Sequence, residues 1–417
     1  MSVAPRAHTS AQNEAWSIPL AKIDVSKAEL YERDAQWGYF ERLRNEDPVH
    51  FCAESEFGPY WSITKFDDIV KVETNTAAFS SERDIVIGDQ LDFAPPMFIA
   101  MDPPLHDEHR KTVTPAVNPA RLAELEPIIR ERAGKILDSL PRNITFNWVD
   151  QVSIELTTQM LAILFDFPFE DRHLLPYWSD VTTASDIVGV TTLPAEERQA
   201  ILHECLAYFM RLWNERVNTD KPGFDFISLL ARGPSTKDMY KDPMLYLGTL
   251  MLLIVGGNDT TRNSLSGGVV ALNKFPGEYD KLRANPALIP SMVSEIIRYQ
   301  TPLAHMRRTA KTDAVIGGKT IRKGDKVIMW YISGNRDETA IERPDEFIID
   351  RANPRHHVSF GFGIHRCMGN RVAEMQLRIV WEEIMKRFER IELVGEPVRT
   401  RSNFVHGFTD VPVRIPA

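Results

Sequence analysis

The chain has 417 residues, more than one hydrophobic core usually holds, so two domains or one large domain are both possible. Hydrophobic residues make up 43% and charged residues 26%, as in ordinary soluble proteins, and the formal net charge is −9. Because no long basic run accompanies this negative charge, a nucleic-acid partner is not expected.

The chain carries no pattern typical of export or membrane insertion. Its first residues, "MSVAPRAHTSAQNEAWSIPL", lack the basic flank and apolar core of a signal peptide, and "LMLLIVGG" is too short to span a bilayer. The three cysteines, Cys52, Cys205 and Cys367, form no CxxC pair, which disfavours disulfide scaffolding, a cysteine zinc site and covalent c-type haem. We expect a soluble, cytoplasmic protein without stable membrane insertion.

In chain order, the predicted elements are mostly helical. Residues 1–25 are expected to form a poorly ordered arm, and residues 46–66 alternate around a Gly-Pro turn like a strand pair. Helices are predicted over 152–165 and from Pro194 to 218, and residues 314–333 form a second β-rich patch. A last helix follows Cys367, with one apolar face that carries Ala373, Leu377, Trp381, Ile384 and Phe388.

The stretch "SFGFGIHRCMGNR" places Cys367 among glycines, where a loop becomes that last helix. A metal-ligating cysteine must be a thiolate, which the free N–H groups at a helix N-terminus can stabilise. Gly361, Gly363 and Gly369 would let the backbone turn sharply and approach a flat ligand. The alternative is a buried structural cysteine in a glycine-rich loop.

The stretch "LLIVGGNDTTRNS" has helical character, although Gly256 and Gly257 interrupt it. Each glycine costs about 1 kcal/mol relative to alanine inside a helix, which suggests a close backbone approach or a local distortion. Asp259 and Thr260 follow at once, and an acid beside an alcohol can relay protons. The alternative is a helix kink with a polar surface patch.

These stretches resemble motifs of the cytochrome P450 family of haem-thiolate monooxygenases. "FGFGIHRCMG" matches the family's cysteine loop, so the resemblance implies Cys367 as the axial ligand of haem b and Phe360 as a shield for its sulfur. The second stretch is similar to the oxygen-binding motif, with Gly257, Asp259 and Thr260 in place. Asp259 would pass protons inward and Thr260 would hydrogen-bond the oxygen being activated.

The resemblance assigns two further groups of residues. Glu295 and Arg298 in "SEIIRY", often a solvated ion pair elsewhere, would pair with Arg351 and brace the cysteine loop. The two haem propionates need cations, for which surface charges are the alternative interpretation. The residues that resemble the propionate ligands of bacterial members are His106, Arg110, Arg308 and His365.

The family's fold is a mainly α, triangular prism with small β-sheets. We expect a single domain over 1–417, with the haem between a distal helix at 243–275 and the proximal cysteine loop. O₂ would be the co-substrate, and NAD(P)H would act only indirectly, because the chain has no GxGxxG fingerprint and no room for a reductase domain. A ferredoxin and its reductase would dock near the basic residues Arg355, His356, His357, Arg366 and Arg371.

Several further stretches, among them "FGPYWSITK" and "QTPLAHMRRTA", look like the bacterial group that hydroxylates the terminal carbon of n-alkanes and medium-chain fatty acids. Flexible covers are expected at 82–100 and 177–192, with Ile85, Leu91 and Phe93 facing the substrate in the first. The expected pocket residues are Leu252, Val255, Leu303, Met306, Val405, Phe408, Ile87 and Met97. The alternatives are a terpene, steroid or other ring substrate, a peroxide-using enzyme, and a non-catalytic haem sensor.

Overall fold

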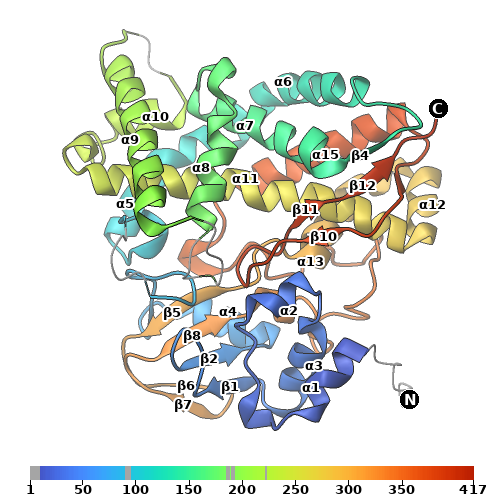
Figure 1. Ribbon diagram of the computed structural model, residues 1–417. Helices are drawn as coiled ribbons and strands as arrows, with labels where there is room; N and C mark the ends of the chain where they lie inside the picture. Colours follow the sequence, from blue (N-terminus) through green and yellow to red (C-terminus); the bar gives the residue numbers. More distant parts are fainter. Residues whose placement is uncertain (1–9, 90–94, 185–187, 189–192, 221–222) are drawn as a thin grey trace.

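The computed structural model describes residues 10–89, 95–184, 188, 193–220 and 223–417. A large helical body lies above a smaller body that holds most of the β-structure (Figure 1). The main helices of the larger body are α5 (Leu105–Val113), α6 (Pro119–Asp138), α7 (Glu155–Phe165), α8 (Leu174–Thr183), α9 (Ala195–Val217), α10 (Phe226–Arg232), α11 (Pro243–Lys274), α12 (Pro276–Ala284), α13 (Ile289–Gln300) and α15 (Asn370–Arg387). The expectation of a mainly α protein with small sheets is confirmed.

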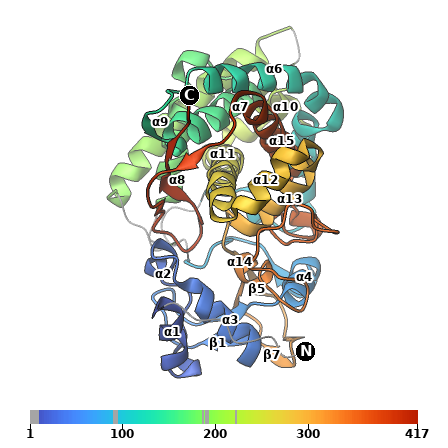
Figure 2. The same ribbon diagram turned by 90° about the vertical axis from the view of Figure 1, so that its right-hand side faces the viewer.

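The smaller body is built around a five-stranded sheet of order β1-β2-β8-β5-β3. Its strands are β1 (Val49–Cys52), β2 (Tyr60–Ile63), β3 (Phe79–Ser80), β5 (Met306–Ala310) and β8 (Lys326–Met329). β2 and β8 run parallel and the other neighbours antiparallel. The helices α1 (Ser10–Ser17), α2 (Ala28–Glu32), α3 (Gln36–Glu46), α4 (Phe66–Thr74) and α14 (Tyr331–Gly334) accompany this sheet (Figures 1 and 2).

Three small sheets complete the architecture. The hairpin of β6 (Ala314–Ile316) and β7 (Lys319–Ile321) turns at Gly317 and Gly318, whose positive φ angles of 54° and 77° suit glycine. β4 (Thr145–Asn147), β12 (Pro412–Arg414) and β9 (Glu392–Leu393) form the second sheet, and β10 (Val398–Arg399) pairs with β11 (Phe408–Asp410) in the third. Both predicted β-rich patches are therefore present.

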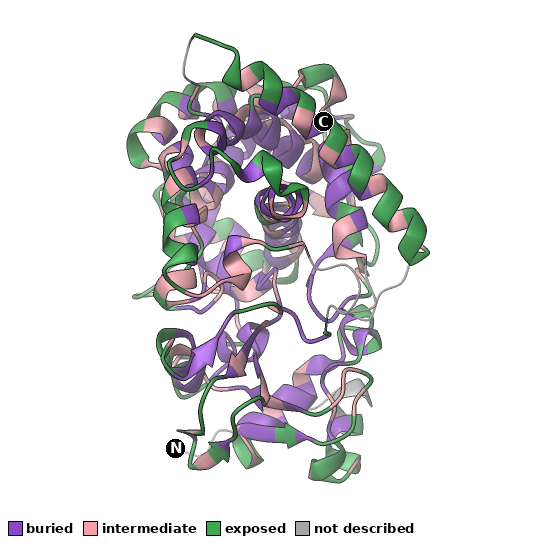
Figure 3. Cartoon of the chain, turned by 90° about the vertical axis from the view of Figure 1, so that its left-hand side faces the viewer, coloured by how far each residue is buried: buried purple, intermediate pink, exposed green. Residues whose placement is uncertain are grey.

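The helix α11 runs through the middle of the helical body, where Figure 2 shows it end-on among its neighbours. The Asp242 side chain accepts a hydrogen bond from the N–H of Leu245, and Pro243 takes the first turn, so the start is defined by sequence. Most of its residues are buried, as the burial colouring in Figure 3 shows for the inner helices. A helix that is apolar nearly all round belongs inside a protein.

Three elements differ from the sequence expectations. Residues 10–25, expected as part of a poorly ordered arm, form α1 and a 3-10 turn, and Ala15, Ile23 and Val25 are buried. The helix predicted over 152–165 begins with a π-helical segment at Val149–Ile154. The β-patch predicted to 333 ends at Met329, because residues 331–334 form α14.

Candidate functional site

The loop before α15 is folded by its own backbone. The N–H of Cys367 donates to the carbonyl oxygen of Phe360 at 2.7 Å, which closes residues 360–367 into a ring. Gly361 and Gly363 have φ angles of 64° and 65°, which other residues rarely adopt. A Cβ atom on Gly363 would lie 2.8 Å from the carbonyl oxygen of Glu73, so α4 lies directly against this loop.

Cys367 differs from the other two cysteines in its surroundings. It is exposed, whereas Cys52 and Cys205 are buried, and burial raises the pKa of the Cys52 thiol to about 11. Burial also raises the pKa of the Cys367 thiol, while the N–H of Gly369 and the guanidinium groups of Arg110 and Arg366 act in the opposite direction. Of the three cysteines, Cys367 is the exposed residue and has arginines close enough to lower its pKa, which suits a thiolate ligand.

The four predicted propionate residues lie together. The rings of His106 and His365 are 4.3 Å apart, and the Nε2 atom of His365 lies 2.9 Å from the hydroxyl of Ser81. Burial and the charges of Arg308, His106 and Arg110 lower the pKa of His365 to about 2. Such a shift indicates several positive groups around one buried ring.

The same cluster retains unused hydrogen-bonding capacity. The Nε2 atom of His106 and the Nδ1 atom of His365 are both buried without a hydrogen-bond partner in the described residues. Buried polar atoms are nearly always satisfied, so unpaired ring nitrogens among arginines indicate a place for an anionic group. The donor set, one accessible cysteine beside these cations, fits the sulfur ligation and the two carboxylates of haem b.

The helix α11 passes the predicted glycines without a break. A Cβ atom on Gly257 would lie 2.6 Å from the Cδ2 atom of Leu161, so this glycine allows α7 to approach closely. Nothing lies within 4 Å of the corresponding position on Gly256, which is exposed. The hydroxyl of Thr260 donates to the carbonyl oxygen of Gly256 at 3.1 Å. The helix is assigned without interruption from Pro243 to Lys274, across both glycines.

The side chain of Asp259 is buried and contacts several neighbouring polar side chains. Its Oδ1 atom lies 2.9 Å from Arg262, accepts from Asn258 at 3.0 Å and accepts from Ser179 on α8 at 3.3 Å. Its Oδ2 atom is buried and unpaired. Burial raises the pKa of Asp259 to about 6, an effect that Arg262 opposes and Asp180 supports. The carboxyl group can therefore take up and release protons near neutral pH.

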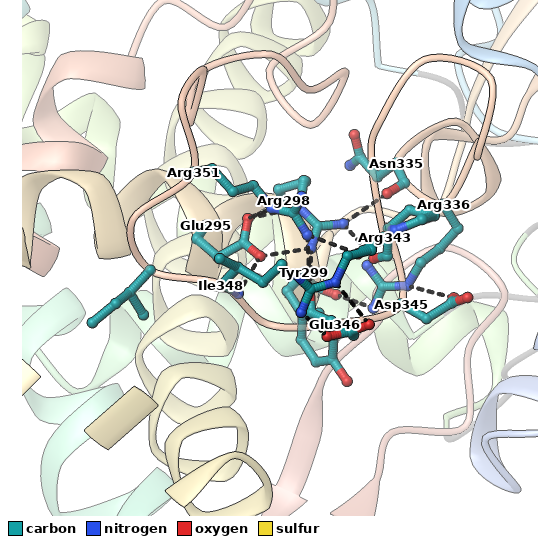
Figure 4. A network of polar contacts seen from close by, with 12 residues as sticks. Glu295, Arg298, Tyr299, Asn335, Arg336, Arg343, Asp345, Glu346, Ile348 and Arg351 are labelled. Carbon is teal, nitrogen blue, oxygen red and sulfur yellow. Dashed lines mark hydrogen bonds and ion pairs between the residues drawn. The ribbon is translucent and has the colours of Figure 1, made fainter. Parts of the chain in front are cut away.

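The predicted Glu295, Arg298 and Arg351 form one buried network (Figure 4). Glu295 is fully buried and accepts from Arg298 at 2.7 and 2.8 Å, from Arg351 at 2.9 Å and from the N–H of Ile348 at 2.8 Å. The two arginines also donate to backbone carbonyl oxygens, including those of Asn335, Pro344, Glu342, Arg343 and Glu346. One carboxylate thus ties α13 to the segment 335–351, and the alternative of a solvated pair is wrong.

Three predicted pocket residues, Leu303, Met306 and Val405, pack in one apolar cluster with Ile85, Val86, Val188 and Phe404. Leu303 and Val405 also form an antiparallel bridge. The cluster combines residues from both predicted cover segments with residues after α13 and near the C-terminus. We call it the distal apolar cluster.

The other predicted pocket residues lie elsewhere. Ile87 is part of the core of the smaller body, whereas Phe408 and the half-buried Leu252 pack in the main helical core. Val255 and Met97 are half-buried and belong to none of the four core clusters of the described residues. Leu91 and Phe93 lie outside the described residues.

The predicted docking patch is only partly basic. Arg355, Arg366 and Arg371 are exposed, as is His356, whose ring stacks on Phe66. His357 is buried, and burial with nearby arginines lowers its pKa to about 3. It is therefore neutral and belongs to the packing of the loop rather than to the charged surface.

Sequence reasoning missed several polar residues that hold the site. Arg262 bridges Asp259 to Asp180 on α8, with 3.0 Å to the latter, and its position three residues after Asp259 on a helix was the available signal. Asn335 accepts from the N–H of Val358 at 2.8 Å and donates to Ser359 at 2.7 Å. No local pattern marked Asn335, because its partners are distant in sequence.

Comparisons with known proteins agree with this geometry. The cytochrome P450 family model matches residues 58–409. Linalool 8-monooxygenase from Pseudomonas putida is 35% identical over 409 residues, 94% of this chain and 99% of that protein. Methyl-branched lipid omega-hydroxylase from Mycobacterium tuberculosis is 30% identical over 413 residues, 95% of each. The solved structure of CYP153D17 from Sphingomonas sp. PAMC 26605 has 46% identity and a TM-score of 0.90, covering 94% of this chain and 99% of that one.

The chain therefore belongs to the cytochrome P450 family, and both the predicted family and the predicted fold are confirmed. Membership implies a monooxygenase that uses O₂ and haem b with a cysteine thiolate ligand. No helix among the described residues has the length and hydropathy that a bilayer-spanning segment needs.

The buried network gives a first prediction, on stability. Glu295→Gln removes the charge that two buried arginines share, and breaking such a pair costs about 3–5 kcal/mol. The free energy of unfolding, measured with urea on the holoenzyme, should fall accordingly. Glu54→Gln is the control, because Glu54 and its partner Lys22 are 82% and 65% exposed and their ion pair contributes little. Equal losses in the two variants would contradict the assigned importance of the network.

Proposed function

We propose that this P450 hydroxylates the terminal carbon of linear aliphatic molecules, n-alkanes or medium-chain fatty acids. The observation that carries the proposal is that Leu303, Met306 and Val405 pack with Ile85, Val86, Val188 and Phe404 from both predicted cover segments in the distal apolar cluster. Burial of a hydrocarbon chain against such a surface is worth roughly 0.8 kcal/mol per CH₂. The relative named for omega-hydroxylation of a methyl-branched lipid supports terminal oxidation of an aliphatic chain.

Within this proposal, Cys367 ligates the haem iron through its thiolate, and Phe360 shields the sulfur. His106, Arg110, Arg308 and His365 hold the propionates with the cations and ring nitrogens that their cluster supplies. When bound, the haem supplies the chemistry of O₂ activation and C–H oxidation, which a thiolate ligand favours.

Asp259 and Thr260 handle protons on α11. The Asp259 carboxyl group takes up protons from the side of Arg262 and Asp180, where the surface is near, and releases them inward. Thr260 keeps its hydroxyl beside the exposed Gly256, where it can turn from the backbone carbonyl oxygen to a reacting oxygen. Glu295, Arg298 and Arg351 brace the cysteine loop.

Electrons come from a ferredoxin and its reductase in this proposal. Exposed Arg355, Arg366 and Arg371 give the surface beside the cysteine loop a positive charge. An anionic ferredoxin would be steered to such a surface.

The second prediction concerns the ligand. Cys367→Ser should abolish the thiolate-type spectrum of the reduced CO complex, because neither Cys52 nor Cys205 has accessible sulfur beside arginines. Cys52→Ser is the matched control and should keep that spectrum. Persistence of the thiolate-type spectrum in Cys367→Ser would refute the ligand assignment.

The third prediction concerns proton delivery. Asp259→Asn should slow product formation by about 10²–10⁴-fold, as expected when a general acid is lost. As the pH rises through about 6, Asp259 loses the proton that it would deliver, so the wild-type rate should fall. The Asp259→Asn profile should be flat in this range. Thr260→Ala should keep the inflection but form less product per reductant consumed, and an inflection that survives in Asp259→Asn would exclude the assignment.

The fourth prediction is the product. Terminal C–H bonds are the strongest in an alkane, so attack there requires a narrow cavity that admits only the methyl end. With octane or a saturated fatty acid of about ten carbons, reduced through ferredoxin, reductase and NADH, the main product should be the terminal alcohol. Gas chromatography of the alcohols measures this outcome directly.

Three results would contradict parts of the proposal. Mainly subterminal alcohols, or binding of bulky ring compounds only, would exclude terminal hydroxylation and leave the monooxygenase assignment intact. Equal turnover with peroxide alone would indicate a peroxide-using enzyme. Absence of any oxidised product under all conditions would favour a sensor.

A further inference from the structure

Glu73, in the last turn of α4, is a buried carboxylate that lies against the cysteine loop. Its exposed fraction is 1%. Its Oε2 atom accepts from the N–H of Phe362 at 3.2 Å and lies 3.4 Å from Arg308, and its Oε1 atom accepts from the hydroxyl of Tyr331. Burial and the charge of Glu73 raise the pKa of Tyr331 well above its usual value, so the phenol remains a donor. Every partner of this carboxylate thus donates.

The cysteine loop is shaped to lie on this group. A Cβ atom on Gly361 would be 3.2 Å from the hydroxyl of Tyr331 and 3.5 Å from the Oε2 atom of Glu73. One on Gly363 would be 2.8 Å from the backbone carbonyl oxygen of Glu73. The two glycines with positive φ therefore allow the loop to touch the end of α4, and the Phe362 N–H between them meets the carboxylate.

Arg308 connects the same carboxylate to the cation cluster. It is 3% exposed, donates to the carbonyl oxygen of Arg307 at 2.8 Å and forms an ion pair with Glu73 at 3.4 Å. Its charge also reaches His365, whose pKa it helps to lower. Glu73 therefore contacts both parts of the haem site, the cysteine loop through Phe362 and the propionate cations through Arg308.

We propose that Glu73 is a positioning residue of the haem site, which fixes the cysteine loop and orients Arg308. The inference rests on the proposed ligation by Cys367. Glu73 is a second anchor of the loop, separate from the network of Glu295, and it adds a buried negative charge against the loop that carries Cys367. It acts through Phe362 and Arg308 and takes no part in the reaction.

Two consequences follow from its charge and its hydrogen bonds. Loss of the negative charge makes reduction of the nearby iron easier, so the reduction potential of the holoenzyme becomes more positive. Loss of the hydrogen bonds lets the loop and Arg308 move, and residues that orient metal ligands typically change affinity about 10–100-fold.

The experiment compares Glu73→Gln with Glu73→Leu in the haem-loaded protein. Glu73→Gln keeps the size and an acceptor for Phe362 and should shift the potential to more positive values while retaining the thiolate-type CO spectrum. Glu73→Leu should also lower haem affinity about 10–100-fold, measured by transfer to apomyoglobin, and reduce the share of thiolate-type CO complex. Tyr331→Phe, which removes one donor, should shift the potential in the opposite direction, because the carboxylate charge is then less neutralised.

Glu383→Gln is the matched control. Glu383 is also a buried, ion-paired carboxylate, but it lies 13 residues into α15, about 20 Å from the helix start at a rise of 1.5 Å per residue. It should lower stability without changing the potential. An unchanged potential in Glu73→Gln would overturn the proposal, even where Glu73→Leu fails to fold. Because Cys367→Ser tests ligation separately, this failure would leave the proposed function standing.

Discussion

The site depends on how the long segment between α14 and α15, which contains no α-helix or β-strand, is held in place. Between the end of α14 at Gly334 and the start of α15 at Asn370, the described backbone forms only one short 3-10 turn. Turns within the segment satisfy part of its backbone, as the bond from Cys367 to Phe360 does, and side chains from other elements satisfy further groups. Glu295 with two arginines, Asn335 and Glu73 supply these contacts from α13, the residue after α14, and α4. The position of Cys367 is a consequence of them.

The cation cluster around His365 and the helix α11 differ in their electrostatics. The cluster around His365 concentrates positive charge and unpaired ring nitrogens, which stabilise an anionic ligand and a thiolate. On α11, by contrast, burial raises the pKa of the Asp259 carboxyl group to a value close to neutral pH. The distal apolar cluster contributes no charge at all. One fold thus combines a cationic cluster that fits the haem propionates, a titrating acid on α11 and a separate apolar cluster.

Local sequence predicted the parts of the site whose motifs are short and contiguous. The cysteine loop closes through the bond from Cys367 to Phe360, and Glu295 pairs with Arg298, whereas Asp259 and Thr260 are neighbours in sequence whose side chains have different partners. Glu73 could not be found this way, because its partners Arg308, Tyr331 and Phe362 are 235, 258 and 289 residues away. An isolated acid in an amphipathic helix looks the same whether it is solvated or buried.

Apolar residues set a similar limit on the fold. Of the residues predicted to line one pocket, Leu303 and Val405 pack in one cluster, whereas Ile87 and Phe408 belong to two different cores. A hydrophobic residue in a short strand or loop does not show by its sequence whether it lines a cavity or fills a core. Ala15 shows the same limit. It is buried because α1 packs against α3, and the sequence of α1 does not reveal this partner. Long-range packing decides these cases.

X-ray absorption at the iron edge of the purified holoenzyme tests the central claim most directly. The account predicts one sulfur atom in the first coordination shell together with the porphyrin nitrogens, and loss of that sulfur scatterer when Cys367 is replaced by serine. A first shell without sulfur in the wild-type protein, or with sulfur retained in Cys367→Ser, would contradict it.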